Sequence, residues 1–307
     1  MRSRRERTAP DAAVLAGRVQ RLAVLLRAGL APAAAWRHLA ETEEDAPELL
    51  RIAERIEAGE PAAEAIEAEG GAIGPWRSVA AAWSIAARAG SPLAATLATL
   101  AGTLRVLAQQ EREGRIALAG PNATARLVAV LPLVALGFGA ALGVDALGLL
   151  FGTGWGRACL GTGIGLMLLA RLWSRRMVAR AARGPVSPGL RLDLLGIALA
   201  GGGALDAARG WVEEACERHA VDDPGAAERA TTVLALAERA GVPATALLAA
   251  EAEELRRTAA AERQERLARL GVTLLIPLGV CILPAFLLLG VVPLVAGVVG
   301  GTIAGLA

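Results

Sequence analysis

The chain has 307 residues, of which 54% are hydrophobic and 20% charged, with a mean hydropathy of +0.47 and a net charge of +2. This composition is too apolar for an ordinary soluble protein and too charged for a channel-like bundle, so charged and apolar residues must occupy different segments. They do, because Leu270–Ala307 has no Asp, Glu, Lys, Arg or His and Leu127–Gly156 has only Asp145.

Residues 1–122 predict a polar all-α domain. Apolar residues such as Leu93, Leu97 and Leu100 recur every three or four positions, which is the period of an amphipathic helix. Prolines precede or open five alanine-rich runs: Pro32, Pro47, Pro61, Pro75 and Pro92. Glycines close four runs: Gly29, Gly59, Gly70 and Gly90. This punctuation predicts a bundle of six short helices. Because arginines interrupt the first helix, no cleaved signal peptide is expected.

An acidic segment lies inside this domain. Glu41–Glu69 contains eleven acidic residues against Arg51 and Arg55, a local balance of −9. The segment is interpreted either as a solvated helix face or as a docking surface for a basic partner.

The first apolar region predicts a transmembrane hairpin over residues 123–174. A bilayer core of about 30 Å needs about 20 helical residues, so Leu127–Gly143 can cross outward and Thr153–Trp173 can return. Arg157 and Arg171 bracket the second crossing closely and must reach the headgroups. Asp145 falls in the connecting turn, which argues against ion coupling within the membrane.

The C-terminal apolar stretch predicts a second hairpin over residues 270–307. Its 38 residues without a charge are enough for two crossings, and Leu289–Pro293 offers the glycine and proline for a turn. Pro132, Pro277 and Pro284 predict kinks, or hinges, within membrane helices. We therefore expect about four transmembrane helices in two hairpins.

Arginines predict the orientation of these helices. They cluster before the first crossing, after the second and before the third, whereas the turn of the first hairpin has only Asp145 and Arg157. By the positive-inside rule, both polar domains face the cytoplasm.

Residues 175–269 read as a shortened second copy of the first domain. Arg88-Ala89-Gly90-Ser91-Pro92 returns as Arg239-Ala240-Gly241-Val242-Pro243 at an offset of 151 residues. Matching Gly29 with Gly201 leaves the second copy short by the length of helices three and four. Four helices are expected, near 190–200, 204–220, 225–240 and 243–269. In each copy the motif predicts a helix end, where the arginine reaches the last carbonyls and the glycine caps.

The residue inventory argues against an enzyme. All 32 basic residues are arginine, so a phosphate-binding loop of the Walker type, which needs lysine, is excluded. His38 and His219 belong to no metal or catalytic pattern, and His38 is expected to be a surface or packing residue. The three cysteines have no zinc or disulfide spacing. We predict no catalytic, cofactor-binding or metal-binding residues, no cofactor and no nucleic-acid partner.

Two polar helical domains, each with Arg-Ala-Gly-x-Pro, a long charged helix and a Leu-Pro or Ile-Pro membrane segment, resemble the type II secretion system F-domain (GspF-like) family. Leu118-Ala119-Gly120-Pro121 follows the first copy. The chain is most similar to platform proteins B and C of tight-adherence (Tad/Flp) pilus systems. The short second copy and the fourth crossing depart from general-secretion members.

This resemblance implies a multi-pass platform protein of the plasma (inner) membrane. Its expected partners are a secretion ATPase, pilin or pseudopilin subunits and a paralogous platform protein, as a homo- or hetero-oligomer in the lipid bilayer. It would couple the ATPase to pilin extraction and filament assembly. If the acidic segment is a docking surface and not a solvated helix face, its basic partner could be this ATPase. The alternatives are a repeat-built membrane transporter and a membrane tether for a cytoplasmic partner.

Overall fold

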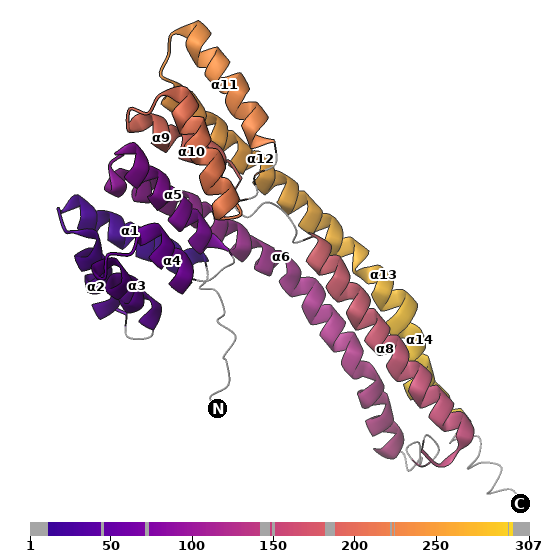
Figure 1. Ribbon diagram of the computed structural model, residues 1–307. Helices are drawn as coiled ribbons and strands as arrows, with labels where there is room; N and C mark the ends of the chain where they lie inside the picture. The colour runs from indigo at the N-terminus through magenta and orange to yellow at the C-terminus, as the bar shows by residue number, and fades with distance from the viewer. Residues whose placement is uncertain are drawn as a thin grey trace, which may run out of the picture. The chain divides into compact units, whose positions relative to one another are not determined.

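The structure is a computed structural model that describes residues 12–43, 46–70, 74–141, 148, 151–181, 188–221, 223, 225–293 and 295–296. Every regular element in these residues is helical, which confirms the predicted all-α class. The chain divides into two compact units (Figure 1). The first unit joins Met1–Arg112 with Gly184–Ala261, and the second joins Glu113–Arg183 with Glu262–Ala307.

The first half of the first unit has the six predicted helices. The first five are α1 (Ala12–Arg27), α2 (Pro32–Glu41), α3 (Pro47–Glu57), α4 (Ala62–Gly70) and α5 (Pro75–Ala89). Proline begins three of them, where its missing N–H costs nothing. Gly29, Gly59 and Gly90 adopt the positive φ of helix ends, as predicted. Gly70 instead is the last residue of α4 and has no positive φ, and a side chain at this position would collide with Trp76.

The sixth helix is much longer than predicted. Helix α6 (Leu93–Ala141) runs for 49 residues without interruption, through Gly120-Pro121-Asn122. A proline inside a helix removes one backbone donor, yet neighbouring packing can tolerate that loss. The end predicted for the first domain, residue 122, therefore lies within a continuous helix.

Tryptophan rings form the centre of the α1–α5 bundle. The ring centroid of Trp36 lies 6.2 Å from that of Trp76 and 6.2 Å from that of Trp83, and all three side chains are buried. Tilted rings at this separation are a favourable aromatic arrangement. Beside this core, the buried Arg18 pairs with Glu43 at 2.8 Å and with Glu48 at 3.1 Å, which fixes α1 to the start of α3.

The second half of the first unit has the four helices predicted for it. They are α9 (Leu190–Ala200), α10 (Leu205–Arg218), α11 (Ala226–Ala240) and α12 (Ala244–Thr273). Helices α5 and α11 both have 15 residues, and they end at the left-handed glycines Gly90 and Gly241, respectively. The expected match of Gly29 to Gly201 is wrong by one position, because Gly202 has the positive φ that corresponds to Gly29.

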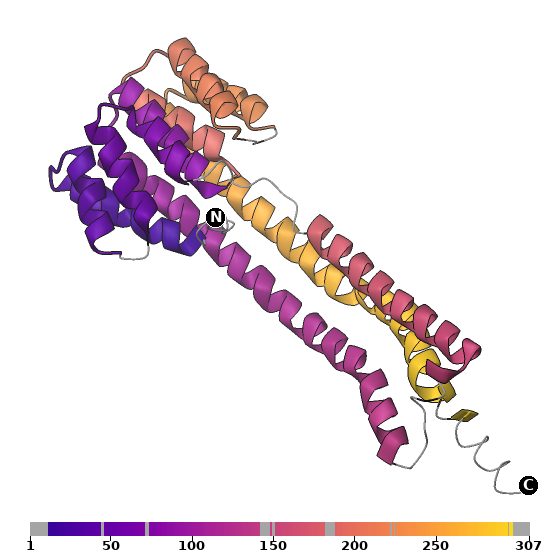
Figure 2. The same cartoon turned by 60° about the horizontal axis from the view of Figure 1, so that its bottom comes forward.

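In the second unit, α8 (Gly154–Ala181) runs alongside the C-terminal helical stretch in both Figure 1 and Figure 2. That stretch comprises α13 (Leu275–Pro277), a π-turn η1 (Leu278–Ile282), α14 (Leu283–Phe286) and a π-turn η2 (Leu287–Val291). Leu289 packs onto Gly163 so closely that a side chain at Gly163 would overlap it. Ala170 lies in a buried cluster with Cys281 and Ile282.

The turn expected at Leu289–Pro293 is wrong, since the backbone stays helical from 289 to 293. Pro293, which lacks a backbone donor, follows the π-helical segment η2, and the wider hydrogen-bond spacing of a π-helix can accommodate such a missing donor. Among the described residues, one helical stretch, Ala244–Val291, is long and apolar enough to cross a membrane. The first predicted hairpin turn, with Asp145, lies outside the described residues.

Candidate functional site at the junction of the two halves

The first unit is closed by contacts between α5 and the pair α9 and α10 (Figure 1). The Arg88 guanidinium forms an ion pair with Glu214 and lies 5.6 Å from the ring centroid of Trp211. Hydrogen bonding from Arg88 lowers the pKa of the Glu214 carboxyl. The sequence predicted that Arg88 serves its own helix end, whereas its side chain joins the two halves of the unit. Arg239 does serve its own helix, donating to the carbonyl of Ala235 at 3.3 Å.

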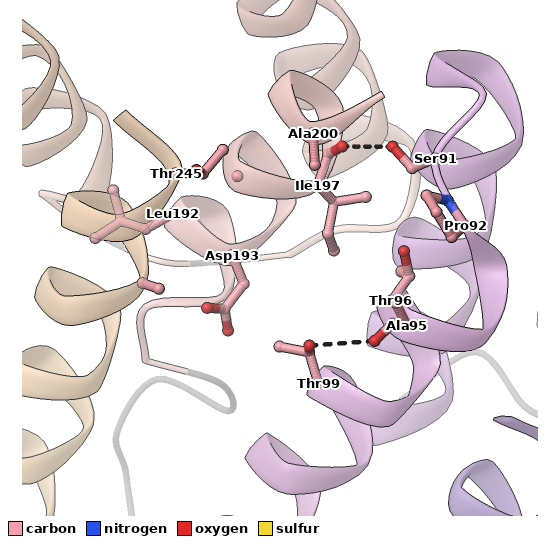
Figure 3. A pocket seen from close by; sticks show the side chains of 12 residues that line it. Ser91, Pro92, Ala95, Thr96, Thr99, Leu192, Asp193, Ile197, Ala200 and Thr245 are labelled. Atoms are coloured by element: carbon pink, nitrogen blue, oxygen red, sulfur yellow. Dashed lines mark hydrogen bonds between the residues drawn. The ribbon is translucent and has the colours of Figure 1, made fainter. Parts of the chain in front are cut away.

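The backbones approach closely next to this ion pair. The Ser91 hydroxyl donates a hydrogen bond of 2.6 Å to the carbonyl of Ile197 on α9 (Figure 3). One turn further, a side chain at Gly201 would overlap the carbonyl of Ala89. The absence of a side chain at Gly201 therefore sets how closely α9 can approach the end of α5.

Asp193 links α6 and α12, the two longest α-helices that the structure describes. Its Oδ2 accepts hydrogen bonds from Arg256 of α12 at 2.8 Å and, more weakly, from the hydroxyl of Thr103 of α6 at 3.4 Å. The Asp193 side chain is only 7% exposed. Burial raises the pKa of this carboxyl, and the positive charge of Arg256 opposes the rise. One carboxylate on α9 therefore contacts both α6 and α12.

A cavity of about 220 Å³ adjoins this carboxylate, between α6, α9 and α12. Figure 3 shows Asp193 and Thr99 on opposite sides of the space, with Thr96 and Thr245 also at its wall. The Thr99 hydroxyl donates back to the carbonyl of Ala95 at 3.2 Å. Within the described part of the chain no three His, Cys, Asp or Glu residues are grouped for a metal ion.

A second polar contact joins α10 to α4. Nδ1 of the buried His219 lies 2.9 Å from the Glu67 carboxylate, and its Nε2 has no hydrogen-bond partner within the described residues. Cys216, one turn earlier, is a buried free thiol whose pKa is raised by burial to about 11. The contact of His219 with Glu67 thus joins the end of α10 to α4 in the first half.

The acidic segment is largely neutralised within the fold. Seven of its nine described carboxylates have an arginine or histidine partner: Glu41, Glu43, Glu48, Glu57, Glu60, Glu67 and Glu69. Two exposed carboxylates, Glu54 and Glu64, have no side-chain partner among the described residues. Most of the carboxylates behind the local balance of −9 are therefore paired within the bundle. Docking by the acidic segment stays a prediction, and Glu54 and Glu64 are its exposed residues without a side-chain partner.

The remaining candidate residues lie apart from the junction. His38 is exposed and contacts Glu41 at 3.0 Å, which confirms its prediction as a surface residue. Cys159 and Cys281 are buried free thiols of the second unit. Pro132 lies within α6. The sequence did not predict the roles of Asp193, Thr103 or His219, because their partners lie 63 to 152 residues away.

Residues 19–141 match the family model of protein F of the type II secretion system (T2SS). The T2SS protein F match begins inside α1 and ends with α6, so it includes Arg88, Ser91 and Thr103 on one side of the junction. It supports the predicted relation to the F-domain family. A search of curated proteins finds no match to the chain. The match spans residues 19–141 and supports a relation of this chain to proteins of secretion and pilus assembly.

Proposed function

We propose that this protein is an inner-membrane platform of a type II secretion or type IV (Tad/Flp) pilus machine. In this proposal it couples a cytoplasmic secretion ATPase to pilin extraction and filament assembly. The T2SS protein F match over residues 19–141 is the observation that carries the proposal. Members of that family are membrane platforms and not enzymes, and a chain without lysine has no Walker-type phosphate-binding loop with which to power assembly itself.

The proposal assigns residues 1–122 and 175–269 to the cytoplasm and residues 123–174 and 270–307 to two transmembrane hairpins. Its support is the segregation of charge in the sequence together with the apolar stretch that ends at Val291. The arginines near the predicted crossings favour cytoplasmic polar domains.

Continuous helices offer a physical route for the coupling. Helices α6 and α12 each begin in the first unit and continue into the second without a break. Asp193 contacts both of them, at Thr103 and at Arg256. A force that moves α9 therefore acts on both α6 and α12. A continuous helix transmits such a displacement better than a flexible joint does.

The decisive experiment is crosslinking in native membranes. A photoreactive residue at Glu54 or Glu64 should capture the secretion ATPase, and Arg209, an exposed position on α10, is the control site. Deletion of the gene should abolish the filament or the secreted product, and the wild-type gene should restore it. Normal assembly in the deletion strain, or reporter tags near Glu54 and Arg218 on opposite faces of the membrane, would refute the platform function.

The same experiment separates the competing functions. A transporter would lose substrate movement and keep filament assembly, whereas a simple tether would capture its partner but leave pilin extraction unchanged. Pilin captured together with the ATPase favours the platform.

A further inference from the structure

The contacts within the first unit are repeated from one half to the other. Helix α1 packs on α2 and α5, and α9 packs in the same way on α10 and α11. Glycines with positive φ set the alignment of the two halves. Gly202 follows Gly29 by 173 residues, which is the offset for the first helices, and Gly241 follows Gly90 by 151 residues, which is the offset for the later ones. Corresponding residues of the two halves can therefore be compared one by one.

One contact lacks a counterpart. Helix α5 packs on α9 and α10 of the other half, whereas α11, which corresponds to α5, has no equivalent neighbour among the described helices. Exposure follows this difference. Ile85 of α5 is 1% exposed, and its counterpart Leu236 of α11 is 47% exposed. Helix α11 therefore exposes the face that corresponds to the buried face of α5.

The residues of α5 that make the contact have exposed counterparts at the end of α11. Arg88 corresponds to Arg239, and Ser91 corresponds to Val242, which is 43% exposed. Arg239 donates only to the carbonyl of Ala235 and has no acidic partner within the described residues. Arg239 and Val242 are therefore both accessible to a partner surface.

The residues that receive α5 also have exposed counterparts, on α1 and α2. Ile197 corresponds to Val24, Trp211 to His38 and Glu214 to Glu41, each at an offset of 173 residues. Val24 is 53% exposed, and the side chains of His38 and Glu41 are 55% and 61% exposed. The charge that binds Arg88 in the first unit is thus repeated, beside an aromatic ring, on an open surface.

We propose that α11 of one copy docks on α1 and α2 of a second copy of this chain, repeating the contact of α5 with α9 and α10. Arg239 pairs with Glu41 of the other copy over the His38 ring, and Val242 packs on Val24. Opposite charges and apolar side chains meet their complements at both places. Such an interface joins different surfaces of the two copies, so it can extend to a third copy.

One difference sets the strength of this contact. Gly201 admits the carbonyl of Ala89 within the chain, whereas its counterpart is Ala28, whose methyl group keeps the second copy further away. The contact between copies is therefore weaker than the internal one. It goes beyond the proposed function and holds for any machine in which the protein works.

A charge exchange tests the pairing in the full chain. Two copies with different tags are expressed together, solubilised from membranes and captured through one tag. Arg239→Glu in both copies, or Glu41→Arg in both, should reduce capture about tenfold through like-charge contact. One copy with Arg239→Glu and the other with Glu41→Arg should recover it, because every contact between unlike copies again pairs opposite charges. Arg209→Glu should leave capture unchanged.

Crosslinking tests the geometry independently, with Cys159, Cys216 and Cys281 replaced by serine. Val24→Cys in one copy and Val242→Cys in the other should give an oxidised dimer that contains both tags. Val14→Cys, an exposed valine elsewhere on α1, should give none with Val242→Cys. Wild-type copies that do not capture one another, or a charge-exchanged pair no better than the single variants, overturn the proposal.

Discussion

Asp193 accepts a hydrogen bond from Arg256 at 2.8 Å, and Gln20 accepts one from Arg105 at 3.0 Å at the corresponding place in the first half. In both halves the long helix after the Arg-Ala-Gly motif reaches back to the first helix through an arginine. The second pair differs in being charged and buried, because α6 covers it with Thr103. In the first half this contact joins two helices, whereas in the second half it joins three, α6, α9 and α12.

We expect Asp193→Ala to lower the free energy of unfolding by about 3 kcal/mol, because it leaves the buried Arg256 with only Glu253 as an acidic partner. Asp193→Asn should cost less, since the amide oxygen can still accept from Arg256. Chemical denaturation of the purified protein in detergent measures both. Asp206→Ala, at an exposed position on α10, is the control and should change stability little.

The same carboxylate predicts a dependence on pH. Burial raises the pKa of Asp193 in the folded protein, so the folded state binds the proton more tightly than the unfolded state. The stability that this protonation adds is complete below the unfolded pKa of about 3.9 and disappears as the pH rises through the folded pKa. Wild type minus Asp193→Asn should therefore lose unfolding free energy with rising pH across this window. A flat difference between pH 4 and pH 7 would contradict the raised pKa.

Gly201→Ala should destabilise the protein by about 1–3 kcal/mol, because the added methyl group overlaps the carbonyl of Ala89. The matched control is Gly210→Ala on α10, where nothing lies within 4 Å of the new methyl group. Alanine there should stabilise the helix by about 0.5–1 kcal/mol. Melting temperatures of the two variants should move in opposite directions, and a Gly201→Ala protein that melts like wild type would show that α9 does not depend on this approach.

Cys216 should resist alkylation in the folded protein. With a pKa of about 11, only about a thousandth of the thiol is ionised at pH 8, and the thiolate is the reactive form. In a background with Cys159→Ser and Cys281→Ser, mass spectrometry after iodoacetamide treatment should show slow labelling that denaturant accelerates strongly. Rapid labelling of the folded protein would mean that α10 opens easily.

The helices were predictable from the sequence because proline and glycine act locally. Pro32, Pro47 and Pro75 start helices, and Gly90 and Gly241 end them, whatever the tertiary context. The length of α6 was not predictable in this way, since Gly120 and Pro121 look like a stop that the fold overrides.

The junction was less accessible to sequence reasoning. The role of Arg88 depends on Glu214, which lies 126 residues away, and no local pattern announces such a pair. The predicted repeat offered one usable signal, because matching Gln20 with Asp193 and Arg105 with Arg256 pairs the same two positions in each half. The charge balance of the acidic segment was incomplete for the same reason, because it leaves out partners such as Arg18 and Arg37, which lie outside the segment in the sequence.

The first unit is discontinuous in the chain, and this has a consequence for biosynthesis. His219 and Glu67, which touch in the finished protein, are 152 positions apart. The ribosome therefore releases α1–α5 long before their partners α9 and α10 exist, and the whole of residues 113–183 must be made in between. During this interval the surface of α5 that packs on α9 and α10 is exposed to solvent. A chaperone that covers this surface would protect the incomplete protein from aggregation.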